Sequence, residues 1–390
     1  MNELWIETGA ISLNKTGESL CGDKVEISGG GDEDLTLVLA DGLGSGVKAN
    51  ILSTLTSKIL CTMISGGIPL EECVSTIAST LPVCSVRKVA YSTFTILRIL
   101  GNRIAHIIQF DNPATIVLRH GEIFDYPRTT RVIADKTIWE TSFPIERDDV
   151  FITMSDGAEY AGVGRQLNFG WTRDSIAVFA MGNYMPSNSA KTTAGLIIDE
   201  CERLYGGKPG DDTTVAVARV RGRHTVSLVV GPPEHREDDQ RMMDLFFGKE
   251  GVKIVCGGTT SQVVSRYLGK PIDATLDYFD PEIPPISHIA GVDLTTEGVI
   301  TLSRVLEYAQ DYLQAAKLAP KWAVQKDGAS LIARELFENA TDVEFYVGRA
   351  INPAHQNPNL PITFAIKQQL IRSLTECLGR MGKHIRVSYF

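Results

Sequence analysis

The clearest pattern of apolar and polar positions in the chain lies between residues 35 and 63. Leu35 to Ala40 form an almost continuous apolar run, which is typical of a buried strand. The run ends at Asp41, and the glycines that follow it predict a tight turn. Apolar residues then recur at every fourth position, which predicts an amphipathic helix (Val47, Ile51, Leu55, Ile59 and Met63). The pattern therefore predicts a strand, a turn and a helix, with a carboxylate at the end of the strand.

Strands dominate the rest of the first 222 residues. Segments that alternate or are rich in Ile, Val, Thr and Phe predict strands at 5–11, 91–100, 103–110, 115–119, 122–126, 149–154 and 213–220, with another that opens at Asp23. Gly101-Asn102 and His120-Gly121 are expected to be hairpin turns, so residues 91–126 are expected to form an antiparallel meander. Helices are expected at 69–81 and 187–204.

The pattern changes after Arg221-Gly222-Arg223, which we interpret as a linker. Predicted strands (224–230, 252–255, 272–276, 343–347 and 385–389) alternate with predicted helices (238–247, 261–268, 296–316, 330–339 and 363–379). This alternation is typical of an α/β domain with a mostly parallel sheet. A chain of 390 residues also exceeds the usual size of a single core. We therefore expect two domains, at residues 1–222 and 223–390.

Composition excludes several classes of protein. The net charge of −9, with no cluster of Lys and Arg, argues against nucleic acid as the partner. The apolar runs are too short for a membrane span, and the first residues lack the features of a signal peptide, so we expect a soluble cytoplasmic protein with no membrane association. The seven cysteines are scattered and never form a CxxC pair, which favours reduced thiols over disulfides or a zinc site.

Four aspartates occupy similar positions, each beside a glycine or at the end of an apolar strand (Asp23, Asp41, Asp156 and Asp211). Any one of them is explained by a simple turn. If paired strands bring all four to one rim, however, the carboxylates would repel each other unless a metal neutralised them. Oxygen ligands without His or Cys favour magnesium, manganese or calcium. A site with two such ions could activate a water for attack on phosphorus.

The motifs carrying these acids, in their order along the chain, resemble those of the type 2C metal-dependent serine/threonine phosphatases (the PPM family), in their bacterial SpoIIE/RsbU/RsbX-like branch. The motifs are GD (Gly22-Asp23), ADGLGSG (40–46), SDG (155–157) and GDDTT (210–214). The resemblance covers about residues 1–222 and implies an α+β fold, an αββα four-layer sandwich of two antiparallel sheets.

The resemblance also implies roles for these residues. Asp41 would bridge two Mn²⁺ or Mg²⁺ ions, and Gly42 would offer its carbonyl to one of them. Asp156 and Asp211 would bind the other ion, and Asp23 would hold an ion or its water. Asp212 would bind water or orient a ligand. A hydroxide between the ions would attack phosphoserine or phosphothreonine on a STAS-domain protein of bacterial stress or sporulation signalling.

Four positions depart from the family pattern or match it poorly. Gly22 stands where many members have a glutamate ligand, and Leu43 where eukaryotic members have a histidine. The arginine that binds substrate phosphate in those members has no clear match, which leaves Lys15, Lys24 and Lys48 as candidates. Asp111 is a candidate for a third metal position, although an Asx turn explains it as well.

Two other functions remain open for the first domain: a non-catalytic scaffold that binds phosphoprotein, and a hydrolase of small phosphoesters. We interpret His106, His120 and Cys256 as structural. For the second domain, Gly231-Pro232, Gly257-Gly258 and Thr295-Thr296 are expected at strand carboxyl ends, where they would line one crevice. That crevice suggests a regulatory ligand pocket, and a homodimer formed through residues 223–390 is the alternative.

Overall fold

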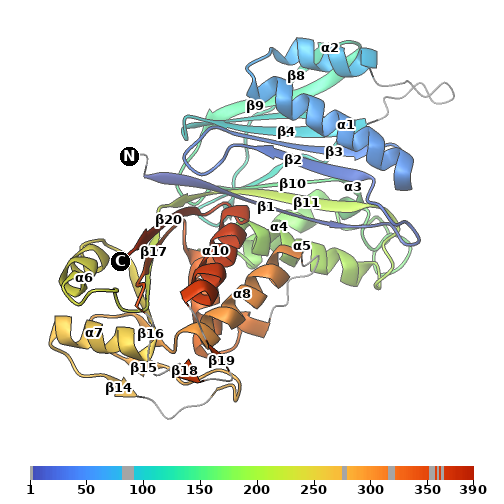
Figure 1. The fold of residues 1–390 in the computed structure, drawn as a ribbon. Helices are drawn as coiled ribbons and strands as arrows, with labels where there is room; N and C mark the ends of the chain where they lie inside the picture. Colours follow the sequence, from blue (N-terminus) through green and yellow to red (C-terminus); the bar gives the residue numbers. More distant parts are fainter. Residues whose placement is uncertain are drawn as a thin grey trace. The chain divides into compact units, whose positions relative to one another are not determined.

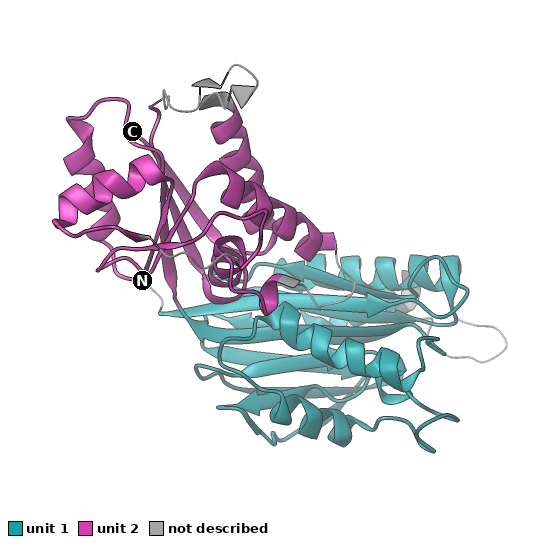
Figure 2. Ribbon diagram, turned by 90° about the horizontal axis from the view of Figure 1, so that it is seen from below, with its two compact units in different colours: residues 1–222, 316–318 teal, residues 223–315, 319–390 magenta. Residues whose placement is uncertain are grey.

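The computed structural model describes residues 3–80, 92–274, 279–314, 321–350, 356–357, 360–361 and 364–390. Contacts divide the chain into two compact units, and the boundary lies between Gly222 and Arg223 (Figure 2). Arg221 and Gly222 are not linker residues, because they pair with Trp5 and Leu4 at the end of a strand. Within the described residues, no helix has the length and apolar character needed to cross a membrane.

The first unit contains two antiparallel sheets (Figure 1). One has the order β1-β11-β10-β6-β7, formed by Leu4–Leu13, Thr213–Gly222, Val150–Met154, Ile116–Arg119 and Glu122–Ile123. The other has the order β2-β3-β4-β5-β9-β8, formed by Asp23–Ser28, Leu35–Gly42, Ser92–Leu100, Ile104–Phe110, Lys136–Pro144 and Thr129–Ile133. These sheets confirm the two antiparallel sheets of the expected sandwich.

Three buried clusters define the layers of this unit. Leu37, Leu39 and Leu97 of one sheet pack with Phe151 and Val220 of the other, so a core lies between the sheets. Helices cover the two outer faces. α1 (Gly46–Ser65) and α2 (Leu70–Thr80) pack on the sheet of β3, whereas α3 (Asp156–Glu159), α4 (Arg173–Gly182) and α5 (Ala190–Leu204) pack on the sheet of β10 and β11. The result is four layers.

The predicted meander at 91–126 was wrong, because its strands belong to different sheets. β4 and β5 pair in one sheet, while β6 and β7 pair in the other. The chain crosses between the sheets at Asp111-Asn112-Pro113, where Asp111 has a left-handed backbone with φ 52° and Pro113 has no N–H for a ladder. The Gln109 side chain stabilises this crossing, since it donates to the Pro113 carbonyl at 2.7 Å and accepts from Thr115 N at 3.2 Å.

Helix α1 exists as predicted, but a different face of it is buried. Val47, Ile51 and Leu55 are exposed, whereas Leu52 and Leu60 contribute to the core beneath the helix. Ala49, Ser53, Thr56 and Ser57 are also buried on that face. The small and hydroxylated residues allow close packing of the helix on the sheet, and the Thr56 hydroxyl is satisfied within the helix by the Leu52 carbonyl at 2.8 Å.

The second unit is built on a seven-stranded sheet of order β14-β15-β16-β13-β12-β17-β20. The pairs from β16 to β20 are parallel, and β14 and β15 add an antiparallel edge. The strands are Asp273–Ala274, Ser287–His288, Leu294–Thr296, Val252–Cys256, Thr225–Val230, Asp342–Val347 and His384–Tyr389.

The short strands β18 (Gln356–Asn357) and β19 (Leu360–Pro361) form a separate pair. The helices are α6 (Asp238–Phe247), α7 (Gly258–Leu268), α8 (Val299–Gln314), η1 (Lys321–Ala323), α9 (Gly328–Ala333), which continues into the π-helix η2 (Arg334–Asn339), and α10 (Phe364–Arg380).

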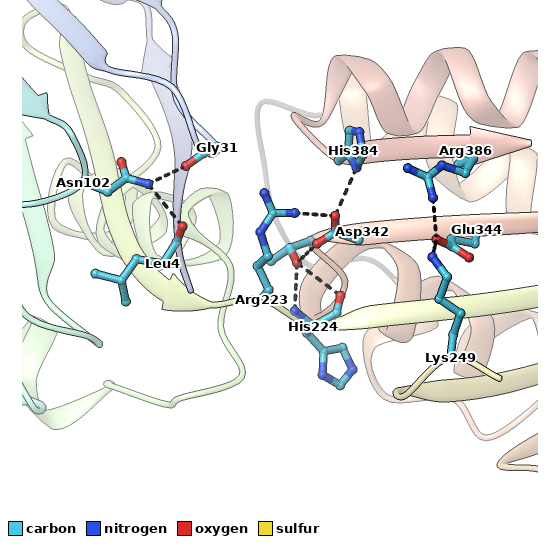
Figure 3. A network of polar contacts seen from close by, with 11 residues as sticks. Leu4, Gly31, Asn102, Arg223, His224, Lys249, Asp342, Glu344, His384 and Arg386 are labelled. Atoms are coloured by element: carbon cyan, nitrogen blue, oxygen red, sulfur yellow. Dashed lines mark hydrogen bonds and ion pairs between the residues drawn. The ribbon is translucent and has the colours of Figure 1, made fainter. Parts of the chain in front are cut away.

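A polar network in each unit connects segments that are far apart in sequence (Figure 3). In the first unit, the Asn102 amide donates to the carbonyls of Leu4 and Gly31 at 3.1 and 3.3 Å. In the second, Asp342 at the start of β17 accepts from Arg223 at 2.6 Å and contacts His384 at 3.1 Å. The Asp342 contacts hold the starts of three parallel strands together, because Arg223 precedes β12 and His384 opens β20.

Candidate metal centre

The fold brings the predicted aspartates to one rim of the sandwich. Asp23 and Asp41 face each other as paired residues of β2 and β3. Asp156 follows β10 and Asp211 precedes β11, and these two strands are neighbours in the other sheet. The two sheets are joined at this rim by the Ser155 hydroxyl, which donates to Asp23 Oδ2 at 2.7 Å. Acids from four strand ends therefore lie at one rim.

Negative charge is concentrated around Asp41. Burial, followed by the charges of Asp23, Asp156 and Asp211, raises the pKa of Asp41 to about 10. Burial and then the Asp211 charge also raise the pKa of Asp156. The charges of neighbouring carboxylates thus add to the effect of burial, and a bound cation would relieve both.

Asp23 is the most deeply buried of these acids, with 3% of its surface exposed. Burial raises its pKa to about 7, although the hydroxyls of Ser155 and Thr214 oppose the rise. Ser155 is itself fixed, because its hydroxyl accepts a hydrogen bond from Thr214 N at 2.9 Å. Ser155 thus orients Asp23, a role the sequence analysis did not assign. A serine at the end of the buried strand β10 was the available signal.

Asp211 lies at the outer edge of the rim, and its side chain is 42% exposed. Lys15 Nζ lies 3.6 Å from Asp211 Oδ1, while Lys15 N donates to Asp212 Oδ1 at 2.9 Å. Of the three lysines considered for phosphate binding, Lys15 therefore lies beside the acids. Lys24 and Lys48 are exposed on β2 and α1.

Two glycines allow close packing at this rim. A Cβ atom at Gly42 would lie 2.1 Å from the Ala49 carbonyl oxygen, so glycine lets the first turns of α1 pack against the end of β3. A Cβ atom at Gly157 would lie 2.1 Å from the Asp212 carbonyl oxygen. The Gly157 carbonyl accepts from the Tyr205 hydroxyl at 2.7 Å, which fixes the segment that carries Asp156.

The donor set of this rim fits a hard divalent cation, because the donors are carboxylate oxygens. Asp23 Oδ1 and Asp212 Oδ2 are buried oxygens without a hydrogen-bond partner in the part of the chain that the structure describes. Among the same residues, no three His, Cys, Asp or Glu side chains are grouped so that they could hold an ion in their present positions. Side-chain rotation would be needed to bring the ligands together, as expected for carboxylates that repel one another.

The remaining candidates lie away from this cluster of acids or have structural partners. Asp111 is exposed in its left-handed turn, and Leu43 is half-buried after the end of β3. His106 lies within β5, and His120, in the turn after β6, contacts Glu146 at 3.0 Å. Cys256 is fully buried, which raises its pKa to about 12 and argues against a nucleophilic thiol.

Comparison with known proteins finds similarity over much of the first unit. Residues 31–221 match the family described as Stage II sporulation protein E (SpoIIE). Stage II sporulation protein E of Bacillus subtilis is 24% identical over 220 residues, which is 55% of this chain and 26% of that protein. The chain thus spans about a quarter of the length of this relative.

The solved structures similar to the chain include the following two. One holds the PP2C phosphatase domain and a fragment of the regulatory domain of SpoIIE from Bacillus subtilis. It has a TM-score of 0.48 and 22% identity, and the match covers 57% of this chain and 65% of that one. The other holds the RsbU and RsbW domains of Rv1364c from Mycobacterium tuberculosis. It has a TM-score of 0.45 and 18% identity, and the match covers 56% of this chain and 62% of that one.

Proposed function

We propose that the first unit, in which residues 31–221 match the family model of SpoIIE, is a metal-dependent phosphatase of phosphoserine and phosphothreonine. The observation that supports this proposal most directly is the group of buried acids around Asp41. Four aspartates from two sheets destabilise one another at this rim, and a protein gains nothing structurally from such an arrangement. Binding of divalent cations would reverse that cost.

We assign the ligands as the sequence suggested. Asp41 would contact two ions, with the Gly42 carbonyl beside it, and Asp156 and Asp211 would contact one of them. Asp23 would hold an ion or its water, and Ser155 would keep the Asp23 carboxylate in place. Mn²⁺ and Mg²⁺ both suit these oxygen donors. Divalent ions bound here would lower the pKa of a water toward about 7 and so supply a nucleophile for phosphorus.

The chain's own residues would position the substrate and the ligands. Lys15, which lies at the outer edge beside Asp211, is placed to contact a phosphate that approaches from solvent. Leu43 has no group that could donate a proton, so a proton for the leaving serine or threonine oxygen would come from solvent at this rim. The Tyr205 hydroxyl would hold the backbone of Gly157, and with it Asp156, during turnover.

The substrate we propose is a phosphorylated bacterial signalling protein of the STAS type, such as an anti-sigma-factor antagonist. This choice follows from the resemblance of the motifs to the SpoIIE/RsbU/RsbX-like branch. We place the reaction in the cytoplasm, where such proteins act. A phosphoprotein-binding scaffold is a weaker explanation, since a scaffold has no need of four aspartates gathered at one rim.

The experiment measures release of phosphate from a phosphorylated STAS-domain protein, with and without Mn²⁺. Asp41→Asn is compared with wild type and with Asp125→Asn, a change of the same kind at an exposed aspartate. We expect release that depends on Mn²⁺, is lost in Asp41→Asn and is unchanged in Asp125→Asn. Equal rates in wild type and Asp41→Asn would refute the metal mechanism. Equal or faster turnover of a small phosphoester would instead favour the hydrolase alternative.

For the second unit we propose a regulatory role at the carboxyl ends of its parallel strands. Val230, Cys256 and Thr296 are in register across β12, β13 and β16. The residues expected to line a crevice therefore end neighbouring strands, where ligands bind in sheets of this type. A homodimer formed through residues 223–390 is the alternative. Removing this unit and measuring phosphate release and assembly by light scattering tests both, because unchanged activity and assembly would contradict each.

A further inference from the structure

Two buried carboxylate oxygens at the rim have no hydrogen-bond partner among the described residues: Asp23 Oδ1 and Asp212 Oδ2. Their residues are only 3% and 4% exposed. A buried oxygen of this kind is costly unless something neutralises it, because the group has lost its water. Asp212 was assigned at most a water-binding or orienting role by the sequence, so its unpartnered oxygen calls for an explanation.

The second oxygen of each carboxylate is fixed by the protein. Asp23 Oδ2 accepts from the Ser155 hydroxyl at 2.7 Å, and Asp212 Oδ1 accepts from Lys15 N at 2.9 Å. Because a carboxylate is planar, fixing one oxygen limits where the other can point. The Thr214 hydroxyl donates to Ser12 Oγ at 2.8 Å. The protein therefore fixes one oxygen of each carboxylate and leaves the other without a partner among the described residues.

Asp212 lies directly beside Gly22, the residue that precedes Asp23. A Cβ atom at Gly22 would lie 2.7 Å from Asp212 Oδ2 and 3.0 Å from the Ala49 Cβ. Asp212 therefore occupies the space that a side chain at position 22 would need. Asp212 Oδ2 can occupy its present position only because residue 22 has no side chain.

We propose that Asp212 Oδ2 and Asp23 Oδ1 are direct ligands of one divalent cation at this rim. In this arrangement Asp212 supplies the carboxylate that Gly22 does not. The ion differs from one held only by Asp156 and Asp211, because its ligands come from the start of β2 and from the loop before β11. The proposal rests on the proposed metal-dependent function, but it concerns which residues bind the ion and can be tested without substrate.

The test is a titration of the full chain with Mn²⁺, followed by calorimetry and by the electron paramagnetic resonance signal of bound Mn²⁺. We expect Asp212→Asn to lose one bound ion or to bind it more than about 100-fold more weakly, since even residues behind the ligands change affinity about 10- to 100-fold. Asparagine keeps the hydrogen bond from Lys15 N but removes the charge. Asp125→Asn is the matched control and should bind as wild type does.

Gly22→Ala provides a second variant that keeps every carboxylate. Its new methyl group would displace Asp212 Oδ2, so we expect weaker binding of the same ion, while the secondary structure followed by circular dichroism stays unchanged. Asp212→Asn with the stoichiometry and affinity of wild type would overturn the proposal and favour a proton shared with Asp23. If wild type bound no Mn²⁺ at all, the proposed function itself would fail. If Asp41→Asn lost activity while Asp212→Asn bound Mn²⁺ as wild type does, the proposed function would stand. Only the assignment of Asp212 as a ligand would be wrong.

Discussion

Both units place buried charge next to glycine at the ends of strands, but the charges differ in sign and in number. In the first unit, burial and the charges of neighbouring aspartates raise the pKa values of Asp23, Asp41 and Asp156. In the second, a single amine, that of Lys367 in α10, lies next to the ends of β12 and β17. Lys367 Nζ donates to the Gly348 carbonyl and lies 2.5 Å from where a Cβ atom at Gly231 would be.

The single amine of the second unit and the several carboxylates of the first need different kinds of stabilisation. A single buried amine can be stabilised by a backbone carbonyl, and it can lose its proton. Burial lowers the pKa of Lys367 to about 8, so both solutions are within reach near neutral pH. Several carboxylates at one site cannot all lose charge so easily, because each adds to the potential on the others. Under the proposed function, the first unit would depend on a cation from outside and the second would not, and the predictions below separate the two cases.

The largest effect is expected from filling the glycine contacts on which both strand ends depend. A Cβ atom at Gly42 would lie 2.1 Å from the Ala49 carbonyl oxygen, and one at Gly348 would lie 2.0 Å from the Pro232 carbonyl oxygen. Gly42→Ala and Gly348→Ala should each lower the free energy of unfolding by about 3 kcal/mol or more, because backbone must move to relieve the overlap. Urea denaturation measures both.

Gly182→Ala is the control, since nothing lies within 4 Å of its Cβ position. We expect a change within about 0.5 kcal/mol there. The comparison also predicts a difference in function. Gly42→Ala should weaken Mn²⁺ binding, whereas Gly348→Ala should leave it unchanged because it alters only the second unit. Weaker Mn²⁺ binding in Gly348→Ala would mean that the two strand ends are not independent.

The next effect concerns Lys367 and depends on pH. Its pKa is lower in the folded chain, at about 8, than its ordinary value of 10.5, so the unfolded chain holds more protons between these values. Stability should therefore rise as pH increases from about 8 to 10.5, and the cost of burying the charge should be complete below pH 8. Lys367→Met removes this cost and should stabilise the protein by up to about 3 kcal/mol at pH 7.

Thermal denaturation across pH 7 to 10.5 checks this sign. The wild type should approach the stability of Lys367→Met as pH rises, and the exposed Lys270→Met should follow wild type throughout. If Lys367→Met destabilises the protein at pH 7, the bond to the Gly348 carbonyl outweighs the cost of burial. Lys367 would then be a structural residue whose charge the second unit needs.

A smaller effect is expected from Ser155, which orients Asp23 in the first unit. Ser155→Ala removes the hydroxyl that donates to Asp23 and accepts from Thr214 N. We expect Mn²⁺ affinity to fall about 10- to 100-fold, as is usual for residues that support metal ligands. Ser12→Ala is the matched control, because Ser12 contacts the Thr214 hydroxyl and, within the described part of the chain, makes no hydrogen bond to Asp23. Equal losses in both variants would point to Thr214 rather than Asp23.

The sequence predicted the strand ends better than the faces of the elements. Asp23, Asp41, Asp156 and Asp211 could be placed because an acid at either end of an apolar run marks where a strand enters or leaves the core. The association of these four acids then followed from strand pairing. The importance of Asp212 and Ser155 could not be predicted, because it depends on which oxygen of each side chain remains without a partner, and that is a property of the packed rim.

The sequence did not predict some other elements, because their apolar residues show no clear helix or strand periodicity. The hairpin of β8 and β9 has mostly exposed residues, such as Val132 and Trp139, so it lacks a clear alternation. Helix α4 is short, and its buried residues are two alanines and one isoleucine (Ala177, Ala180 and Ile176). The predicted meander was wrong because turn residues alone do not show whether the strands on either side of them belong to the same sheet. Asp111 and Pro113 mark the crossing only once the sheets are known.

Helix α1 gives the smallest and last prediction, since the sequence indicated the wrong face. Ile51 is 52% exposed and Leu52 only 5%, although Ile51 belongs to the apolar stripe that the spacing favoured. Ile51→Ser should change the free energy of unfolding by no more than about 0.5 kcal/mol, whereas Leu52→Ala should cost about 2–5 kcal/mol. Urea denaturation of the two neighbouring variants decides which face supports the helix that follows Asp41. A large loss in Ile51→Ser would restore the face predicted from the sequence, and the packing of Ala49 against Gly42 would then need another explanation.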